Sequence, residues 1–159
     1  MNFGLLLGLI GGVLAALLAG IGSAIGIGIA GRAATGVLSE KPERYTQMFL
    51  LVVLPGTQGF YGFVIALFAI LKLGLLGEES VAITTIQGLE LAVACLPIAF
   101  AGLVSAIHQG KTCAAGILMT AKRPELSVKA GVIYAAMVEV YAVLGFLVSL
   151  LMVMGVKVG

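Results

Sequence analysis

The stretch FGLLLGLIGGVLAALLAGIGSAIGIGIA, residues 3–30, contains no charged residue. The hydrocarbon core of a bilayer is about 30 Å thick and takes about 20 helical residues per crossing, so this stretch can span a membrane as one helix. No basic segment precedes it, and it is too long for the hydrophobic region of a signal peptide. We therefore expect it to remain in the mature protein as the first transmembrane helix.

The whole chain has the composition of a membrane protein. Its 159 residues are 61% hydrophobic and 10% charged, with 23 glycines and a mean hydropathy of +1.21, whereas average soluble domains are about 25% charged. This length allows four crossings with short connections and leaves no room for a nucleotide site. The formal net charge of +2 is too small to suggest nucleic-acid binding. Any energy source must be an ion gradient or a partner subunit.

Three further apolar stretches follow the first one, over residues 46–71, 81–107 and 127–156. None shows the two-residue alternation of a barrel strand, and each is far longer than the roughly 9–11 residues that such a strand needs. We therefore predict an all-α membrane protein with four transmembrane helices.

Positive charges are concentrated at one end of this arrangement. They flank the link between the first two stretches and the link between the last two, at Arg32, Lys41, Arg44, Lys111, Lys122, Arg123 and Lys129. Lys72, Lys157, Glu78 and Glu79 lie toward the other end. By the positive-inside tendency, both hairpin turns are predicted to face the cytoplasm and both termini the opposite side of the cell membrane.

The second half of the chain repeats the first. GSAIGIG at 22–28 aligns with VSAIHQG at 104–110, and EKPE at 40–43 aligns with KRPE at 122–125, both at an offset of 82. GFV at 62–64 aligns with GFL at 145–147 at an offset of 83. Each hairpin begins and ends on the same side, so the copies are parallel repeats. We predict a single membrane domain over residues 1–159, made of one hairpin over 1–76 and a second over 77–159.

Parallel hairpins in tandem favour a ring. Repeated heterologous contacts around an axis close into rings, and positions 4, 8, 12, 16, 20, 24 and 28 of the first stretch are all Gly or Ala. Such a stripe of small residues lets helix backbones approach closely. We predict a homo-oligomeric ring with the first helix in a crowded inner layer, and generic packing inside a monomeric bundle is the alternative.

One carboxylate lies deep in the apolar sequence. Glu139 follows the proline of the second turn by 15 residues and Gln109 precedes it by 15, while Thr57 and Gln58 follow the proline of the first turn by 15 and 16. All four are therefore expected at one level, about 22 Å from the turns. An ionisable residue at such a depth costs about 2.5–3.5 kcal/mol to insert, which makes it a functional candidate. A protonated glutamic acid that only joins neighbouring helices is the alternative.

These groups suit a monovalent cation. Hard cations take oxygen ligands, and one carboxylate with neutral oxygens from Thr57, Gln58 and Gln109 would balance a single positive charge. Pro55 removes a helical hydrogen bond, and a backbone carbonyl is expected to turn toward the site there, with a tolerated kink as the alternative. The hydroxyl of Tyr61, one turn beyond Thr57, is expected to hydrogen-bond the carboxylate.

The remaining chemistry-bearing residues are expected to have structural roles. One histidine and two scattered cysteines cannot supply a zinc site. Cys95 and Cys113 are expected to pack between helices, Pro97 is expected to be a tolerated kink, and His108 is expected to lie near a helix end.

At these residues the chain resembles the membrane proteolipid of rotary V-type ATPases, which is known by the letters c or K. The resemblance covers essentially the whole chain and rests on LPGTQGFYGFVIA (54–66), SAIHQGK (105–111) and AAMVEVYAVLGF (135–146), together with the duplication. It implies a non-catalytic subunit in a ring that turns against a stator membrane subunit with an essential arginine. It also implies a central-stalk subunit and membrane lipids as partners, with ATP hydrolysis in a separate soluble sector.

Sodium-translocating bacterial members of this family are similar to the chain at all of the positions of their ion site. The resemblance implies Na+ as the coupling ion, with H+ as the alternative because proton-translocating relatives need only the carboxyl group. The implied ligands are the Leu54 backbone carbonyl, Thr57, Gln58, Gln109 and Glu139, with Tyr61 closing onto the carboxylate. A stand-alone channel or small transporter is a competing function, and a purely structural proteolipid would leave Glu139 unexplained.

Overall fold

The computed structural model describes residues 2–76 and 82–158, and every regular element in these ranges is helical. The main helices are α1 (Phe3–Leu38), α2 (Tyr45–Val53), α3 (Thr57–Lys72), α4 (Thr85–Lys122) and α5 (Ile133–Gly155). Short 3₁₀ turns over Pro42–Arg44 and Leu54–Gly56 precede α2 and α3, and a π-helical segment over Ser127–Val132 leads into α5. The all-α prediction is confirmed. The predicted boundary at 76/77, Glu78, Glu79 and the start of the third stretch at Val81 lie outside the described residues.

Four helical spans of the described chain are long and apolar enough to cross a membrane: Phe3–Leu38, Pro42–Lys72, Thr85–Lys122 and Ser127–Gly155. The chain is thus a multi-pass membrane protein. With 36 and 38 residues, α1 and α4 are each about 55 Å long at 1.5 Å per residue, so they project well beyond a hydrocarbon core of about 30 Å.

Two helices extend past the apolar stretches that mark them in the sequence. The first and third stretches become less apolar after residues 30 and 107, but α1 and α4 continue for two turns or more, to Leu38 and Lys122. Hydropathy reports the membrane boundary, whereas the helices end only as the chain approaches Pro42 and Pro124, whose rings disfavour a preceding helical residue. His108 therefore lies inside α4 and not near its end.

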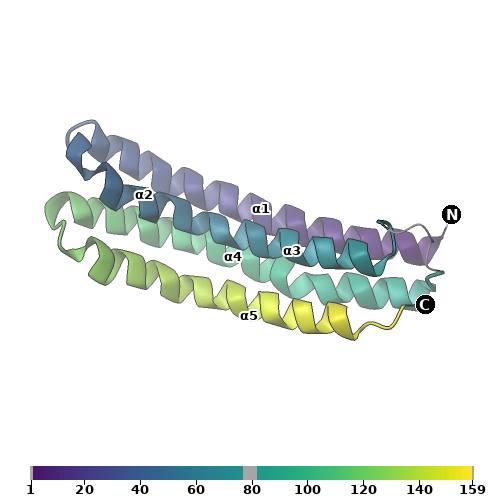
Figure 1. Cartoon of the computed structure of the whole chain (residues 1–159). Helices are drawn as coiled ribbons and strands as arrows, with labels where there is room; N and C mark the ends of the chain where they lie inside the picture. Colours follow the sequence, from purple (N-terminus) through teal and green to yellow (C-terminus); the bar gives the residue numbers. More distant parts are fainter. Residues whose placement is uncertain (1, 77–81, 159) are drawn as a thin grey trace.

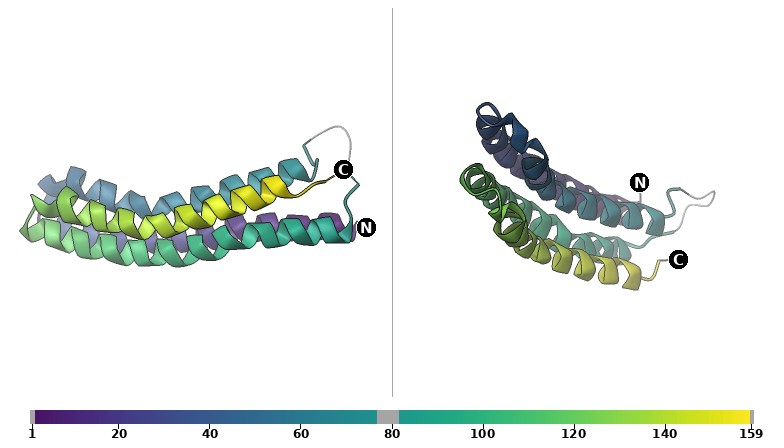
Figure 2. Two further views of the ribbon diagram at one scale, coloured as in Figure 1. Left: turned by 90° about the horizontal axis from the view of Figure 1, so that it is seen from below. Right: turned by 60° about the vertical axis from the view of Figure 1, so that its left-hand side comes forward.

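The two hairpins share their backbone geometry at both ends. Asn2 and Thr84, which are 82 residues apart, cap the N-termini of α1 and α4, and each side chain accepts a hydrogen bond from the amide three residues later. At the turns, Lys41 has φ −136° and ψ 68°, and Arg123, again 82 residues later, has φ −137° and ψ 76°. Both turns lie at one end of the bundle and both termini at the other (Figure 1; Figure 2). The structure is therefore two parallel helical hairpins in tandem.

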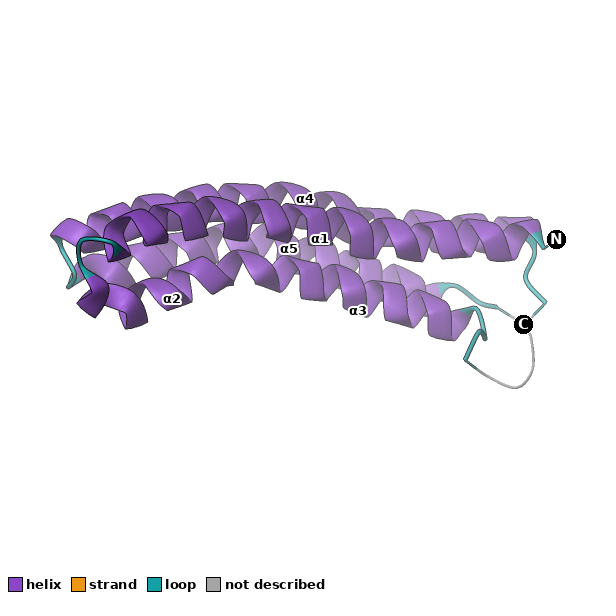
Figure 3. Cartoon of the chain, turned by 90° about the horizontal axis from the view of Figure 1, so that it is seen from above, coloured by secondary structure: helices purple, strands orange, loops and turns teal. Residues whose placement is uncertain are grey.

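The four spans form two layers. α1 and α4 lie along one side of the bundle, and α2, α3 and α5 lie along the other (Figure 3). Backbone meets backbone between α1 and α4: a Cβ atom added to Gly11 would lie 2.5 Å from Ala92 Cα, and one added to Gly22 would lie 2.6 Å from the Leu103 carbonyl oxygen. Only glycine allows this approach.

The small-residue face of α1 differs from the predicted stripe. Its buried members include Gly12 of the predicted stripe, but those that follow one another at spacings of three and four are Gly4, Gly8, Gly11, Ala15, Ala19, Gly22 and Gly26. A strict spacing of four turns about 40° round a helix at each step, so its later members leave the α4 face. Ala24 is exposed, and a Cβ atom added to Gly20 would meet nothing within 4 Å.

The remaining predictions on packing residues agree with the structure. Cys95 and Cys113 are free and fully buried. Pro97 lies inside α4, which continues through it, and the amide of the next residue, Ile98, donates to the Ser149 hydroxyl oxygen at 3.0 Å.

Candidate ion-binding site

Pro55 interrupts the second span at the level of the predicted site. Proline lacks the amide hydrogen that a continuous helix needs, and the chain forms a 3₁₀ turn over Leu54–Gly56 between α2 and α3. The Leu54 carbonyl oxygen accepts hydrogen bonds from the amide and the hydroxyl of Thr57, the latter at 3.0 Å. The break therefore places a main-chain oxygen and a hydroxyl oxygen side by side.

Both oxygens of the Glu139 carboxylate accept hydrogen bonds. The Tyr61 hydroxyl donates to Oε1 at 2.7 Å, and Gln109 Nε2 donates to Oε2 at 3.3 Å. The predicted contact between Tyr61 and Glu139 is thus present. Tyr61 comes from α3, Gln109 from α4 and Glu139 from α5, so the site joins the first hairpin to the second.

Two buried amides connect this carboxylate to the break at Pro55. Gln58 Nε2 donates to Gln109 Oε1 at 2.5 Å, and Gln58 Oε1 lies 3.4 Å from Thr57 Oγ1. Both glutamines have no exposed surface, and buried polar groups of this kind need partners. The structure therefore brings all six predicted residues into one contiguous set. Leu54 and Thr57 belong to it through Gln58, since the described residues show no direct bond from either to Glu139.

Within residues 2–76 and 82–158, no ion pair balances the charge of Glu139. The described residues contain two ion pairs, Arg44–Glu43 at 3.8 Å and Arg123–Glu125 at 3.9 Å, and both lie at the turns. The donors that reach Glu139, a phenol and an amide, are neutral. An ionised carboxylate surrounded by apolar helices is costly without a counter-charge. A proton or a cation is needed to neutralise it.

Glu139 is also reachable from outside the bundle. It is half-buried, whereas Gln58 and Gln109 are fully buried, and its neighbours Met137, Val140 and Tyr141 on α5 are exposed. The carboxylate therefore lies at the outer face of the α3–α5 layer, with its neutral partners behind it. Within the described residues no three His, Cys, Asp or Glu side chains are grouped as metal ligands. The groups that could coordinate a cation at Glu139 are therefore mainly neutral oxygens.

Sequence reasoning missed one acceptor in the site, one beside it and one further along the bundle. Gln109 Nε2 also donates to the Ala135 carbonyl oxygen at 3.0 Å, and a backbone acceptor of this kind has no signature in the sequence. Ser23 Oγ accepts from the amide of Gly59 at 2.8 Å. Ser149 pairs with the amide that follows Pro97, and for that contact the proline itself was a usable signal.

The fold and this site define a class of membrane proteolipid. The sequence profile of the ATP synthase C-subunit family matches residues 10–69 and 92–152, one match in each hairpin. The chain belongs to this family.

Among characterised proteins, the chain is 50% identical over 128 residues to the V-type sodium ATPase subunit K of Enterococcus hirae, and the match spans 80% of this chain and 78% of that protein. It is 34% identical over 155 residues to the A-type ATP synthase subunit K of Methanocaldococcus jannaschii, across 98% of this chain and 65% of that protein. The resemblance to V-type proteolipids is thus confirmed across most of the sequence.

Proposed function

We propose that the chain is the ion-carrying subunit of a rotor ring in a V-type ATPase, and that it binds Na+ at Glu139. Rotation of the ring, driven by ATP hydrolysis in a separate soluble sector, would carry the ion across the membrane. The observation that carries this proposal is a carboxylate with two neutral hydrogen-bond donors at the half-exposed outer face of an apolar layer. Neither of the ion pairs found among the described residues involves it.

The donor set favours a monovalent cation over a proton. A proton needs only one carboxylate oxygen, whereas Leu54, Thr57, Gln58 and Gln109 add four neutral oxygens in the same set. One carboxylate with neutral oxygens binds a single positive charge without leaving a net charge in the membrane. A side-chain amide presents either its oxygen or its nitrogen on rotation about its last torsion, so the two glutamines serve the carboxylate with or without an ion. The similarity to a sodium ATPase subunit supports the same choice.

The position of the carboxylate suits loading and unloading during rotation. A neutral ion–carboxylate pair on the outer face faces lipid at a lower cost than a bare charge. A stator subunit with an arginine would displace the ion as Glu139 passes it, and a central-stalk subunit would join the ring to the soluble sector. The two basic turns would face the cytoplasm.

Carbodiimide labelling of Glu139 in the purified protein tests the identity of the ion. At fixed pH, Na+ is expected to slow labelling because the reagent modifies the protonated carboxyl group and the ion excludes the proton. A Glu139→Gln variant supplies the background for labelling elsewhere. If Na+ gave no protection while low pH accelerated the reaction, the sodium assignment would be wrong and H+ would be the coupling ion.

A further inference from the structure

The internal repeat identifies the surfaces that join one copy of this chain to the next. Within the chain, the first hairpin packs on the second along α1 and α4. If the same parallel step is repeated, the next hairpin is the first hairpin of a second copy, and it packs on the far flank of α4 and α5. This inference rests on the ring in the proposed function. Take a contact between residue x of the first hairpin and residue y of the second. The repeat predicts an equivalent contact between residue x + 82 of one copy and residue y − 82 of its neighbour.

The residues selected by this rule are apolar and exposed. The contact of Gly11 with Ala92 maps onto Val93 and Ile10, which are 45% and 44% exposed. The contact of Gly22 with Leu103 maps onto Val104 and Ile21, which are 54% and 42% exposed. Both pairs are therefore uncovered in the single chain and are available to a neighbouring copy.

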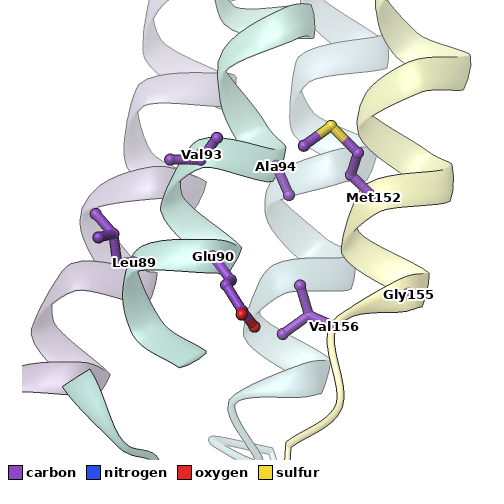
Figure 4. A pocket seen from close by; sticks show the side chains of 7 residues that line it. All are labelled: Leu89, Glu90, Val93, Ala94, Met152, Gly155 and Val156. Atoms are coloured by element: carbon purple, nitrogen blue, oxygen red, sulfur yellow. The ribbon is translucent and has the colours of Figure 1, made fainter. Parts of the chain in front are cut away.

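The α4–α5 flank and the α1–α3 flank both carry recesses at positions that the repeat pairs between neighbouring copies. Between α4 and α5, one recess of about 490 Å³ is lined by Val93, Glu90 and Met152 among others (Figure 4). Because Val93 maps opposite Ile10, this recess would take Ile10 of the neighbouring copy.

A second pair of recesses lies closer to the ion site. On the α4–α5 flank, Ala101, Val104 and His108 line one of about 360 Å³, and on the α1–α3 flank Gly20 lines another of about 390 Å³. The buried contact of Ala19 with Gly102 maps Ala101 onto Gly20. The rule thus places one recess against the other.

We infer that the flank formed by Ile86, Val93, Ala101, Val104 and His108 docks on the flank formed by Leu6, Ile10, Gly20, Ile21, Ala24 and Gly28 of a second copy. His108 is the point where the two interfaces differ most. It corresponds to Gly26, which within one chain contacts Ala106 and Gly110, so its partners in the neighbour are Ala24 and Gly28.

Those partners leave room for an imidazole. Ala24 is exposed, and a Cβ atom added to Gly28 would meet nothing nearer than Arg32 Nη1 at 3.7 Å. The histidine, which is exposed in the single chain, fills this space between copies. The inner layer of the ring therefore alternates close backbone contacts within each copy with wider, side-chain-filled gaps between copies.

The turns carry a matching polar contact. Within the chain, Lys41 Nζ donates to the Ala121 carbonyl oxygen at 2.7 Å. The same rule maps this contact onto Arg123 of one copy and the Ser39 carbonyl of the next. The Arg123 side chain is 73% exposed and has only a loose ion pair, with Glu125 at 3.9 Å, so it is free to make this contact.

Cysteine cross-linking of the assembled protein tests the register. In a background with Cys95→Ala and Cys113→Ala, the double variant I21C/V104C is expected to give a ladder of cross-linked oligomers with a short bis-thiosulfonate reagent. Each single variant should give no cross-linked oligomers, because the interface does not bring residue 21 of one copy to residue 21 of the next, or residue 104 to residue 104. The matched control is I21C/L118C, since Leu118 is equally exposed but lies off the docking flank.

Electron microscopy of the same samples separates the possible failures. Intact rings without a 21/104 ladder, or with equal cross-linking in the control, would overturn the register while leaving the proposed function standing. Monomers in place of rings would overturn both the interface and the rotor, while protection of Glu139 by Na+ would still report ion binding separately.

A steric test isolates the role of His108. Gly28→Leu is expected to leave the helical content of the chain unchanged and to lower the ring fraction at least tenfold, and adding His108→Gly is expected to restore it. Gly36→Leu is the control: Gly36 is equally open, and its counterpart Leu118 lies off the flank. Rings in Gly28→Leu, or no rescue by His108→Gly, would refute the placement of the imidazole.

Discussion

The two hairpins agree at their caps and turn residues but differ along their second spans: a 3₁₀ turn over Leu54–Gly56 breaks one, and a π-helical segment over Ser127–Val132 begins the other. The caps, Asn2 and Thr84, and the turn residues, Lys41 and Arg123, are related by one offset of 82. Both caps have an extended backbone, and the two turn residues have nearly the same φ and ψ. Yet α1 carries glycine at 22 and 26, where α4 carries Val104 and His108. The comparison shows that caps and turns set the register of a repeat, while one face of one helix determines how closely the next repeat approaches.

The outer helices show a second division between the hairpins. At the position that corresponds to Glu139, the first hairpin has Gly56 or Thr57, depending on whether the offset is 83 or 82. In the structure both lie at the 3₁₀ break, where Thr57 bonds the Leu54 carbonyl. The second hairpin therefore supplies the one charge together with Gln109, and the first supplies the other neutral oxygens, so the two hairpins share one carboxylate.

The largest expected effect comes from removing the charge that distinguishes the second hairpin. Glu139→Gln is expected to abolish ion transport and ion-coupled ATPase activity in the reconstituted complex, because the amide cannot balance a cation. The ring should still assemble, as electron microscopy would show. Glu125→Gln makes the same chemical change at the exposed turn and should leave transport within about twofold of the parent. Transport by Glu139→Gln would contradict the assignment of the carrier residue.

The close contact between α4 and the glycine face of α1 gives the next largest effect. A Cβ atom on Gly110 would overlap the backbone of Gly26, whereas one on Gly36 would meet nothing within 4 Å. Gly110→Ala is expected to destabilise the protein by about 1–3 kcal/mol through overpacking. Gly36→Ala should be neutral or should stabilise α1 by up to about 1 kcal/mol, because alanine favours helix.

Thermal unfolding in lipid nanodiscs would measure this difference. Equal unfolding temperatures for the two variants would mean that α1 and α4 do not meet backbone to backbone.

An effect of similar size, confined to ion binding, should come from the hydrogen bond that joins the hairpins at the site. Tyr61→Phe removes the donor to Glu139 Oε1, and a hydrogen bond to a charged group contributes about 1.5–3 kcal/mol. The Na+ concentration that protects Glu139 from carbodiimide should then rise by about tenfold or more. Tyr134→Phe, at an exposed position on α5, should leave protection unchanged. An unchanged Na+ requirement in Tyr61→Phe would show that the tyrosine does not close the site.

Much of this arrangement could be predicted from the sequence because helix geometry is regular. Counting residues from the two turn prolines placed Gln58, Gln109 and Glu139 at one level, and the structure joins them by hydrogen bonds. The rise per residue is constant in a helix, so depth can be counted even where the packing partners are unknown.

What could not be predicted depends on details that hydropathy and spacing do not encode. The end of α1 at Leu38 follows from the approaching proline and not from polarity. The buried face of α1 follows the 3.6-residue period, so a stripe counted in steps of four diverges from it at Gly20. The Ala135 carbonyl that accepts from Gln109 is a backbone atom, and any residue type at that position would supply it.

The glycine contact between α1 and α4 has a mechanical consequence for a rotor. Where two backbones touch directly, as at Gly22 and Leu103, no side-chain torsion lies between them that can rotate to relieve a load. A sideways force applied to Glu139 on α5 passes to α4 and then to α1 as to one stiff body. Any compliance in the ring would be concentrated in the wider gaps between copies, so torque would be stored there and not within the protomer.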